Sequence, residues 1–212
     1  DMDGDMDAVG AAYTSGVYWW ENDGSQVFTA HPIATGFNGG WSVDVVDLDQ
    51  DGDYDVLAAS AARDEIAWFE NDGNENFAWL TIASNFDNAY SVVAFDSDND
   101  GDIDVAGGGH HTASDLRLWV NDGNENFNEI WVTNDFEGVY SFDAADVDGD
   151  GDTDIIAPAR DDNKISWFRN NGGNDFTENI LSNQFNSAKD AYGVDLDGDG
   201  DMDILGASGM DL

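Results

Sequence analysis

The nine residues Asp47–Asp55, "DLDQDGDYD", place a carboxylate at every second position and a glycine at the sixth. Like charges packed this closely repel one another, so the segment needs either open water or a bound cation. The pattern recurs as "DSDNDGDID" at 96–104, "DVDGDGDTD" at 146–154 and "DLDGDGDMD" at 195–203, and the chain begins with "DMDGDMD" at 1–7. From Asp47 on, the first aspartates of the motifs are 49, 50 and 49 residues apart, which indicates a structural repeat.

Other landmarks keep the same step along the chain. Each repeat has an Asn-Asp-Gly or Asn-Asn-Gly turn, a phenylalanine four residues after that turn, and another phenylalanine nine residues later. The turns end at Gly24, Gly73, Gly123 and Gly172, and the phenylalanines are Phe28, Phe77, Phe127 and Phe176, then Phe37, Phe86, Phe136 and Phe185. So many landmarks in register predict one supersecondary unit per repeat.

Each repeat contains four short apolar stretches typical of β-strands, which in the second repeat are 41–47, 56–60, 66–70 and 77–83. The glycine turn between the last two is a hairpin signal, and no segment has helical periodicity with caps. Four antiparallel strands in each of several repeats predict an all-β fold, a β-propeller of four-stranded blades. The alternative is a parallel β-helix, but that fold repeats its glycine-aspartate motif every nine residues or so.

The repeat predicts a single propeller region over residues 1–212. Its divisions are a partial blade 1–37, blades 38–86, 87–136 and 137–185, and a partial blade 186–212. These units amount to 17 strands, one more than a closed four-bladed ring needs. We therefore expect an incomplete portion of a larger propeller, of roughly five to eight blades. A less favoured alternative is completion of the ends by a neighbouring copy through strand exchange.

The acidic motif has the ligand order of a calcium loop. Counted from its first aspartate, carboxylates fall at positions 1, 3, 5 and 9, glycine at 6 permits a sharp turn, and residue 7 offers its main-chain carbonyl; calcium takes six to eight such oxygens. The predicted ligands are Asp47, Asp49, Asp51, Asp53 and Asp55; Asp96, Asp98, Asp100, Asp102 and Asp104; Asp146, Asp148, Asp150, Asp152 and Asp154; Asp195, Asp197, Asp199, Asp201 and Asp203; and, in the shorter first motif, Asp1, Asp3, Asp5 and Asp7. Up to five Ca²⁺ ions follow.

Three other interpretations fit the motif less well. An EF-hand is excluded because strands flank the motif and position 12 is Ala58, Gly107, Ala157 or Gly206 instead of glutamate. Magnesium is disfavoured because it prefers a rigid, water-rich octahedral shell. A solvated acidic turn would suit one copy, but four complete copies in register favour calcium.

The loop between strands, together with "WFENDG" at 68–73, resembles the FG-GAP (VCBS-type) repeat of integrin-α-like β-propellers. The resemblance covers the whole chain and implies an extracellular, calcium-stabilised propeller whose calcium loop joins the first two strands of each blade. The chain departs from the pattern in one respect. The Phe-Gly and Gly-Ala-Pro landmarks are degenerate, with "IAPA" at 156–159 the nearest.

Composition limits the classes of partner. With 6 basic and 46 acidic residues the net charge is −40, which repels nucleic acid and anionic membrane surfaces. Eight Trp, six Tyr and twelve Phe supply a core that disordered acidic chains lack. There are no cysteines, and no apolar run approaches the roughly 18 residues of a membrane span, so membrane insertion is not expected.

A second candidate site lies opposite the acidic loops. The start of the first strand of successive blades holds Trp41, Tyr90, Tyr140 and Lys189. Aromatic side chains at a propeller mouth stack on sugar rings or grip peptides, although packing between blades would also account for them. Most cations gather toward the same end, namely Arg63, Arg117, Arg160, Lys164 and Lys189. The pair His110–His111 is more typical of an exposed loop than of a metal site.

No catalytic constellation is present, since the chain lacks Gly-x-Ser-x-Gly, His-Glu-x-x-His and phosphate-loop motifs. The sequence therefore favours a lectin-like adhesion module that binds glycans or proteins at a cell surface or in a matrix. Two alternatives stay open: the propeller domain of a calcium-dependent polysaccharide lyase or other secreted hydrolase, and a structural spacer or filament subunit.

Overall fold

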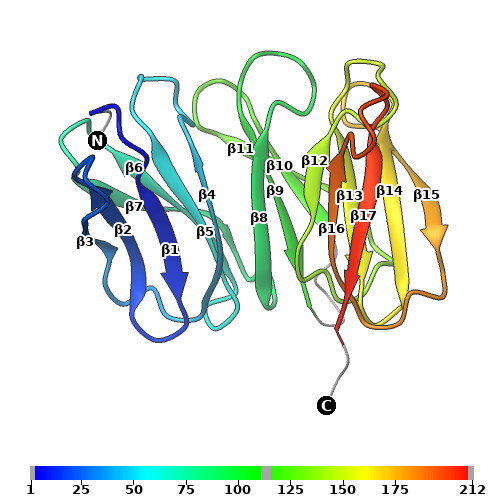
Figure 1. Cartoon of the computed structure of the whole chain (residues 1–212), viewed down its shortest axis with the longest axis horizontal. Helices are drawn as coiled ribbons and strands as arrows, with labels where there is room; N and C mark the ends of the chain where they lie inside the picture. The colour runs from blue at the N-terminus through cyan, green and yellow to red at the C-terminus, as the bar shows by residue number, and fades with distance from the viewer. Residues whose placement is uncertain (1–2, 111–115, 210–212) are drawn as a thin grey trace.

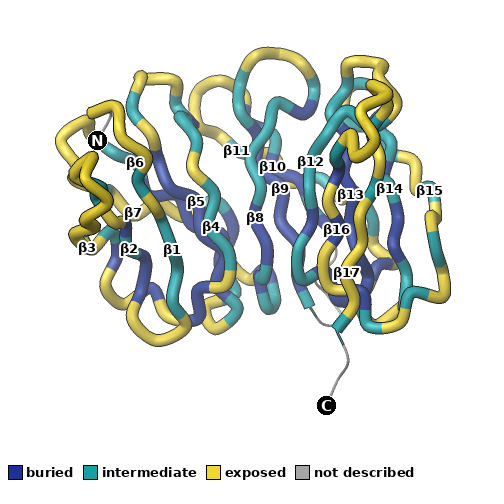
Figure 2. The backbone as a smooth tube through the Cα atoms, in the orientation of Figure 1, coloured by how far each residue is buried: buried dark blue, intermediate teal, exposed yellow. Residues whose placement is uncertain are grey.

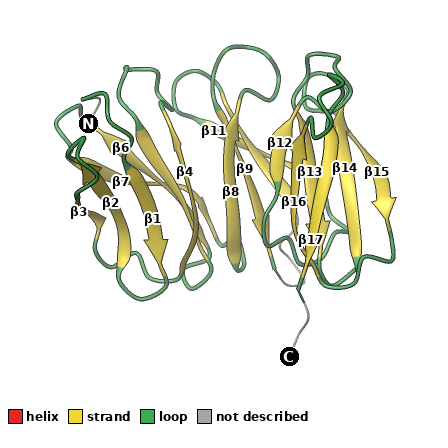
Figure 3. Cartoon of the chain, viewed as in Figure 1, coloured by secondary structure: helices red, strands yellow, loops and turns green. Residues whose placement is uncertain are grey.

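The structure, a computed structural model, describes residues 3–110 and 116–209, and every regular element in that part of the chain is a β-strand (Figure 3). Two residues singled out from the sequence, Asp1 and His111, lie outside the described residues. The described residues include no helix long and apolar enough to cross a membrane.

Within residues 3–110 and 116–209, five antiparallel sheets follow one another. The first contains β1 (Ala8–Ala12), β2 (Gly16–Asn22) and β3 (Phe28–Ala34). The second contains β4 (Gly40–Val46), β5 (Asp55–Ser60), β6 (Glu65–Asn71) and β7 (Phe77–Ser84). The third contains β8 (Ala89–Phe95), β9 (Asp104–Gly109), β10 (Leu116–Asn121) and β11 (Phe127–Thr133). The fourth contains β12 (Asp143–Ala145), β13 (Asp154–Ala159), β14 (Lys164–Asn170) and β15 (Phe176–Ser182), and the fifth β16 (Ala188–Val194) and β17 (Asp203–Ser208).

The sheets stand side by side in an open arc, with the first sheet at one end and the fourth and fifth, which overlap in this view, at the other (Figure 1). Within each sheet the strands pair in chain order. The first strand of a sheet contacts the first strand of the next, as β4 does β8 and β12 does β16. This is the predicted all-β architecture of four-stranded propeller blades, and the described blades do not close into a ring.

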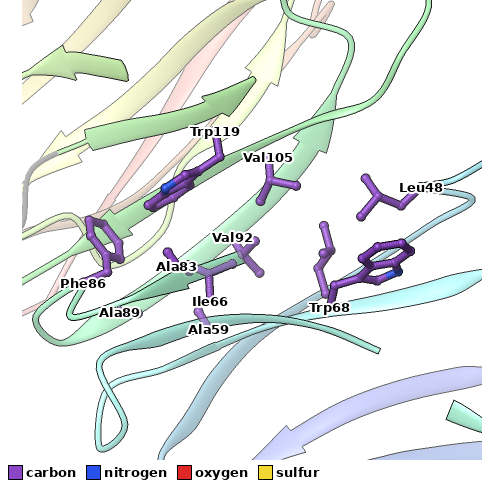
Figure 4. Packing of buried hydrophobic residues seen from close by; sticks show 11 residues of the cluster. Leu48, Ala59, Ile66, Trp68, Ala83, Phe86, Ala89, Val92, Val105 and Trp119 are labelled. Carbon is purple, nitrogen blue, oxygen red and sulfur yellow. The ribbon is translucent and has the colours of Figure 1, made fainter. Parts of the chain in front are cut away.

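The cores lie between neighbouring sheets, where the buried middle strands face one another (Figure 2). All residues of β5, β9 and β13 are buried. Between the second and third sheets, Trp68 and Leu48 pack in one cluster with Trp119 and Phe86 (Figure 4). Small residues are needed on the middle strand, because a Cβ on Gly107 would lie 2.7 Å from the Trp119 ring.

Cations pack at the interfaces between neighbouring blades, which we call the joints. In three successive joints a cation lies over the ring of a buried phenylalanine that ends the preceding blade, and such contacts are worth about 0.5–2 kcal/mol. The pairs are Arg63 over Phe37 (6.0 Å), Arg117 over Phe86 (5.2 Å) and Lys164 over Phe136 (4.6 Å). The cations that the sequence placed opposite the acidic loops thus include three that hold the fold together.

One strand is shorter than the sequence predicted. In the repeat, residues 140–146 correspond to the predicted strand 41–47, but β12 covers only Asp143–Ala145. The chain before it turns to the preceding blade, where the Val139 N–H donates to the Gly109 carbonyl at 3.0 Å. Val139 and Phe142 are buried against Gly108, where a Cβ would lie 2.5 Å from the Val139 side chain. The glycines of β9 leave the space that these side chains fill.

Candidate functional site

Each complete acidic loop joins the first two strands of a sheet, so all of them lie along one edge of the arc, the upper edge in Figure 1. We call this the loop edge. The loops connect β4 to β5, β8 to β9, β12 to β13 and β16 to β17, and the segment 3–7 precedes β1 in the same way.

The glycine at position 6 closes each loop on its first aspartate. Gly52 has a φ of 102° and Gly101 a φ of 97°, a left-handed conformation that glycine adopts at little cost. Their N–H groups donate to Asp47 Oδ2 at 3.1 Å and to Asp96 Oδ2 at 3.0 Å. The same bond forms in the third and fourth loops. The glycine at position 6 and its hydrogen bond therefore fold each loop around its own carboxylates.

The aspartate at position 9 ties the loop to the hairpin turn of its own blade. The fully buried Asp55 accepts the Asn71 N–H at Oδ1 (2.8 Å) and the Leu48 N–H at Oδ2 (3.2 Å). Burial raises the pKa of Asp55 to about 6, and it also raises the pKa of Asp104 and Asp154, which hold the equivalent place. A positive charge nearby would stabilise the ionised carboxylates and lower their pKa values again.

The carboxylates at positions 1 and 3 come together in every complete loop. Each cluster has a third member, from position 5 or position 9, with its ligand atoms within 4.8 Å of one another. The clusters are Asp47–Asp49–Asp51, Asp96–Asp98–Asp104, Asp146–Asp148–Asp154 and Asp195–Asp197–Asp199.

The donor set of the first two complete loops fits a cation. Asp47 Oδ1, Asp96 Oδ1 and Asp98 Oδ1 are buried without a hydrogen-bond partner among the described residues, which is costly for a carboxylate. Burial, and then the neighbouring aspartates, raise the pKa of Asp98, and burial also raises that of Asp49. Hard oxygen donors with unmet charge are what calcium prefers in proteins.

The aspartate at position 7 turns its side chain elsewhere. A Cβ on Gly73 would lie 2.3 Å from Asp53 Oδ2, so that carboxylate rests on the hairpin turn, and Asp102 rests on Gly123 in the same way. Only the main-chain carbonyl of position 7 remains for the loop. In the first segment, Asp3 Oδ1 accepts the Asp5 N–H at 2.9 Å and Asp7 Oδ1 accepts the Asn22 N–H at 2.8 Å.

β-Bulges set the direction of the residues at the other end of the first strands. The register shifts between Gly40 and Ser42, which leaves Trp41 as the extra residue, and it shifts in the same way at Tyr90 and Lys189. An extra residue re-aims its side chain out of the ladder. Tyr140 reaches the equivalent place from the irregular segment before β12.

Four rings form a continuous row, which we call the aromatic row: Tyr13, Trp41, Tyr90 and Tyr140. Tyr13 and Trp41 meet edge to face at 6.5 Å, Trp41 and Tyr90 at 4.7 Å, and Tyr90 stacks on Tyr140 at 4.8 Å with the planes 11° apart. Tyr13 is 60% and Trp41 52% exposed, and the other two are half-buried. The row thus spans several blades and stays accessible.

Polar groups flank the Tyr140 end of the row. The His110 ring lies 5.2 Å from that of Tyr140, and its Nε2 is 2.9 Å from Asp161 Oδ2. The Arg160 guanidinium lies 5.5 Å above the Tyr140 ring. Lys189 has no ring contact among the described residues, and it lies at the fifth sheet, where a Cβ on Gly209 would meet it at 2.6 Å.

Sequence reasoning missed Tyr13 and Asp161 as parts of this site. Tyr13 lies in the connection from β1 to β2 and Asp161 in the connection from β13 to β14, and no repeated landmark marks either position. The common place of Trp41, Tyr90 and Tyr140 in the repeat predicts that they lie together, and Tyr90 contacts both of the others.

Comparison with known proteins gave a family and a structural likeness. The FG-GAP-like repeat matches residues 1–58, 47–107, 98–157 and 146–206. No curated protein gave a match. Among 36 matching chains of solved structures is a lectin from Agrocybe aegerita, described for specific recognition of non-reducing terminal N-acetylglucosamine. Its TM-score is 0.64 at 20% identity, and the match covers 96% of this chain but 58% of the lectin chain. At that identity the likeness concerns the fold alone.

Proposed function

Because the chain belongs to the family of FG-GAP-like repeat proteins, we propose that it is a calcium-stabilised β-propeller module that acts outside the cell and binds glycans through its aromatic row. The observation that carries glycan binding is the row itself, four rings in contact of which Trp41 and Tyr13 are more than half exposed.

Sugar rings have apolar faces that stack on aromatic side chains, while their hydroxyl groups take hydrogen bonds from polar neighbours. The row offers the faces, and Asp161, His110 and Arg160 offer polar atoms beside Tyr140. The likeness to a lectin supports a glycan over a protein ligand, at the level of ligand class only.

Calcium has a structural part in this proposal. Asp47, Asp49 and Asp51 would hold it in the first complete loop, and Asp96, Asp98 and Asp104 would hold it in the second. Calcium bound there supplies positive charge to carboxylates that otherwise repel one another. A calcium requirement suits the calcium-rich medium outside cells, and the cysteine-free chain has no disulfides to stabilise it there.

A glycan array that includes chains ending in N-acetylglucosamine tests the proposal. The double variant Trp41→Ala/Tyr140→Ala removes two rings of the row and is expected to weaken binding at least tenfold. Tyr192→Ala is the control, since Tyr192 is 56% exposed on β16 and outside the row. A double variant that binds as tightly as the wild type would contradict the proposal. A wild-type protein that binds no glycan on the array would also contradict it and would favour a structural spacer.

The cluster at Tyr140 keeps one catalytic alternative open. His110 paired with Asp161, beside Tyr140 and Arg160, could remove the proton next to a uronic acid carboxylate while the cation stabilises the resulting charge. The glycosidic oxygen would then leave with the C–O bonding electrons, and a double bond would form. Incubation with acidic polysaccharides, followed by ultraviolet absorbance of unsaturated ends, separates this lyase from a lectin.

A further inference from the structure

We infer that the calcium loops of the three complete blades are unequal, and that the third is held by an arginine of the chain in place of an ion. Loops 47–55 and 96–104 are then the tight sites, while loop 146–154 is closed by Arg169. The inference rests on the proposed calcium binding and adds which loops take part in it.

The first argument is the charge that faces each loop. The residue three positions before the turn glycine is Glu70, Val120 or Arg169 in the three blades. Glu70 directly follows Phe69, which pairs with Val56 at the end of the first complete loop, so its side chain is carried beside that loop. The facing charge therefore changes from negative through neutral to positive along the arc.

Arg169 contacts the corresponding carboxylates of the third loop directly. Its Nε lies 2.7 Å from Asp148 Oδ2, and its Nη2 donates to Asp150 Oδ2 at 2.8 Å. Positions 3 and 5, two predicted calcium ligands, thus already have a cation, and a dication beside that guanidinium would be repelled.

The second argument is independent and concerns position 1. Asp47 Oδ1 and Asp96 Oδ1 are buried and have no hydrogen-bond partner in the part of the chain that the structure describes. Asp146 Oδ1, by contrast, accepts the N–H groups of Gly149 at 2.8 Å and Asp150 at 3.2 Å. The position 1 carboxylate oxygen that lacks a partner in the first two loops therefore accepts two hydrogen bonds from its own loop in the third.

The residue at position 4 of the loop also differs between the first two loops and the third. It is Gln50 in the first complete loop and Asn99 in the second, both with φ near 60°, and Gly149 in the third. Gln50 Nε2 donates to the Gly101 carbonyl at 2.6 Å, and Asn99 Nδ2 donates to Asp152 Oδ1 at 2.7 Å. These side chains brace one loop against the next, whereas the glycine lets the third loop close on its own aspartate.

Counting bound ions in matched variants tests the inference. Native mass spectrometry and calorimetric titration with calcium chloride are compared for the wild type and for Arg169→Val, which copies Val120. Arg169→Val should bind one more calcium ion, or bind its weakest ion at least tenfold tighter. Val120→Arg should weaken one site by a similar factor. Lys189→Val changes the net charge equally at an exposed place and should leave count and affinities unchanged.

Thermal unfolding separates a folding defect from a binding effect. In chelator, Arg169→Val should melt below the wild type because Asp148 and Asp150 then repel one another without a cation. In millimolar calcium its gain in Tm should exceed that of the wild type. Equal counts with affinities within twofold would overturn the inference alone, as would the same change in Lys189→Val. Absence of calcium binding in every variant would overturn both it and the proposed calcium dependence.

Discussion

The aspartate at position 9 serves the fold as well as the loop. Asp55 has no exposed surface, and its two oxygens accept N–H groups from the hairpin turn and from Leu48. Charge in a buried place is costly, and burial accordingly raises its pKa to about 6. The folded protein without calcium therefore binds a proton at Asp55 more tightly than the unfolded chain does, whose aspartates titrate near 3.8.

Calcium-free protein should consequently lose stability as the pH rises. Between pH 4 and pH 6 the folded state binds more protons than the unfolded state, so the free energy of unfolding falls over that range, by about 2 kcal/mol for Asp55. Urea unfolding in chelator at several pH values measures this. Asp55→Asn removes the titrating group and should flatten the slope, and an unchanged slope in that variant would contradict the assignment to Asp55.

At the level of elements, the blade joints combine apolar packing with a repeated cation. Arg63 lies 4.6 Å from the Trp79 ring and 6.0 Å from that of Phe37, and its Nε is 2.7 Å from Glu65 Oε2. Glu65 is 5% exposed, and its other oxygen accepts from Trp79 Nε1 at 3.0 Å and from Thr81 Oγ1 at 2.7 Å. The arginine thus neutralises a buried carboxylate and covers the end of the preceding blade.

Replacing this cation should loosen the joint. Arg63→Met keeps the apolar stem but leaves Glu65 without its cation, and a buried charge that loses one partner is expected to cost about 1–3 kcal/mol. Urea unfolding in saturating calcium gives the free energy of unfolding. Lys189→Met, the same change at an exposed residue, should cost under about 0.5 kcal/mol. Equal losses in the two variants would show that the joint does not depend on the cation.

At the scale of the whole molecule, the side-by-side blades concentrate negative charge along one edge. The chain carries a net charge of −40, and each complete blade brings its acidic loop to the same loop edge. Neighbouring loops are braced by side chains such as Gln50, so their charges cannot move apart freely. Binding of a dication to the folded state alone stabilises it by mass action.

Calcium removal should therefore lower the Tm. A site at ten times its Kd adds about 1.4 kcal/mol. Two tight sites then correspond to about 5–10 °C for a chain of this length. Differential scanning fluorimetry in chelator and in calcium measures the shift, with sodium chloride at equal ionic strength as the control for screening. A Tm that chelator leaves unchanged, or that sodium restores fully, would contradict specific binding.

The sequence by itself determined the repeat, the strand order and the loops. Their signals are local: a glycine at position 6, a hairpin turn and alternating apolar residues each specify the conformation of a few neighbouring residues. Spacing repeated four times then identified the blade, and with it the common place of Trp41, Tyr90 and Tyr140. The strand that began late, β12, depends on a glycine-rich strand of the preceding blade, which no local signal reports.

The tertiary structure alone decided which side chains meet across blades. Tyr13 joins the aromatic row, and Asp161 flanks it, because connections some 50–150 residues apart come to the same end of the arc. Arg169 occupies the third loop because antiparallel pairing brings the end of β14 beside the turn before β13. Such contacts depend on the packing of neighbouring strands and blades and on the direction of each side chain, so equal motifs in the sequence became unequal sites in the fold.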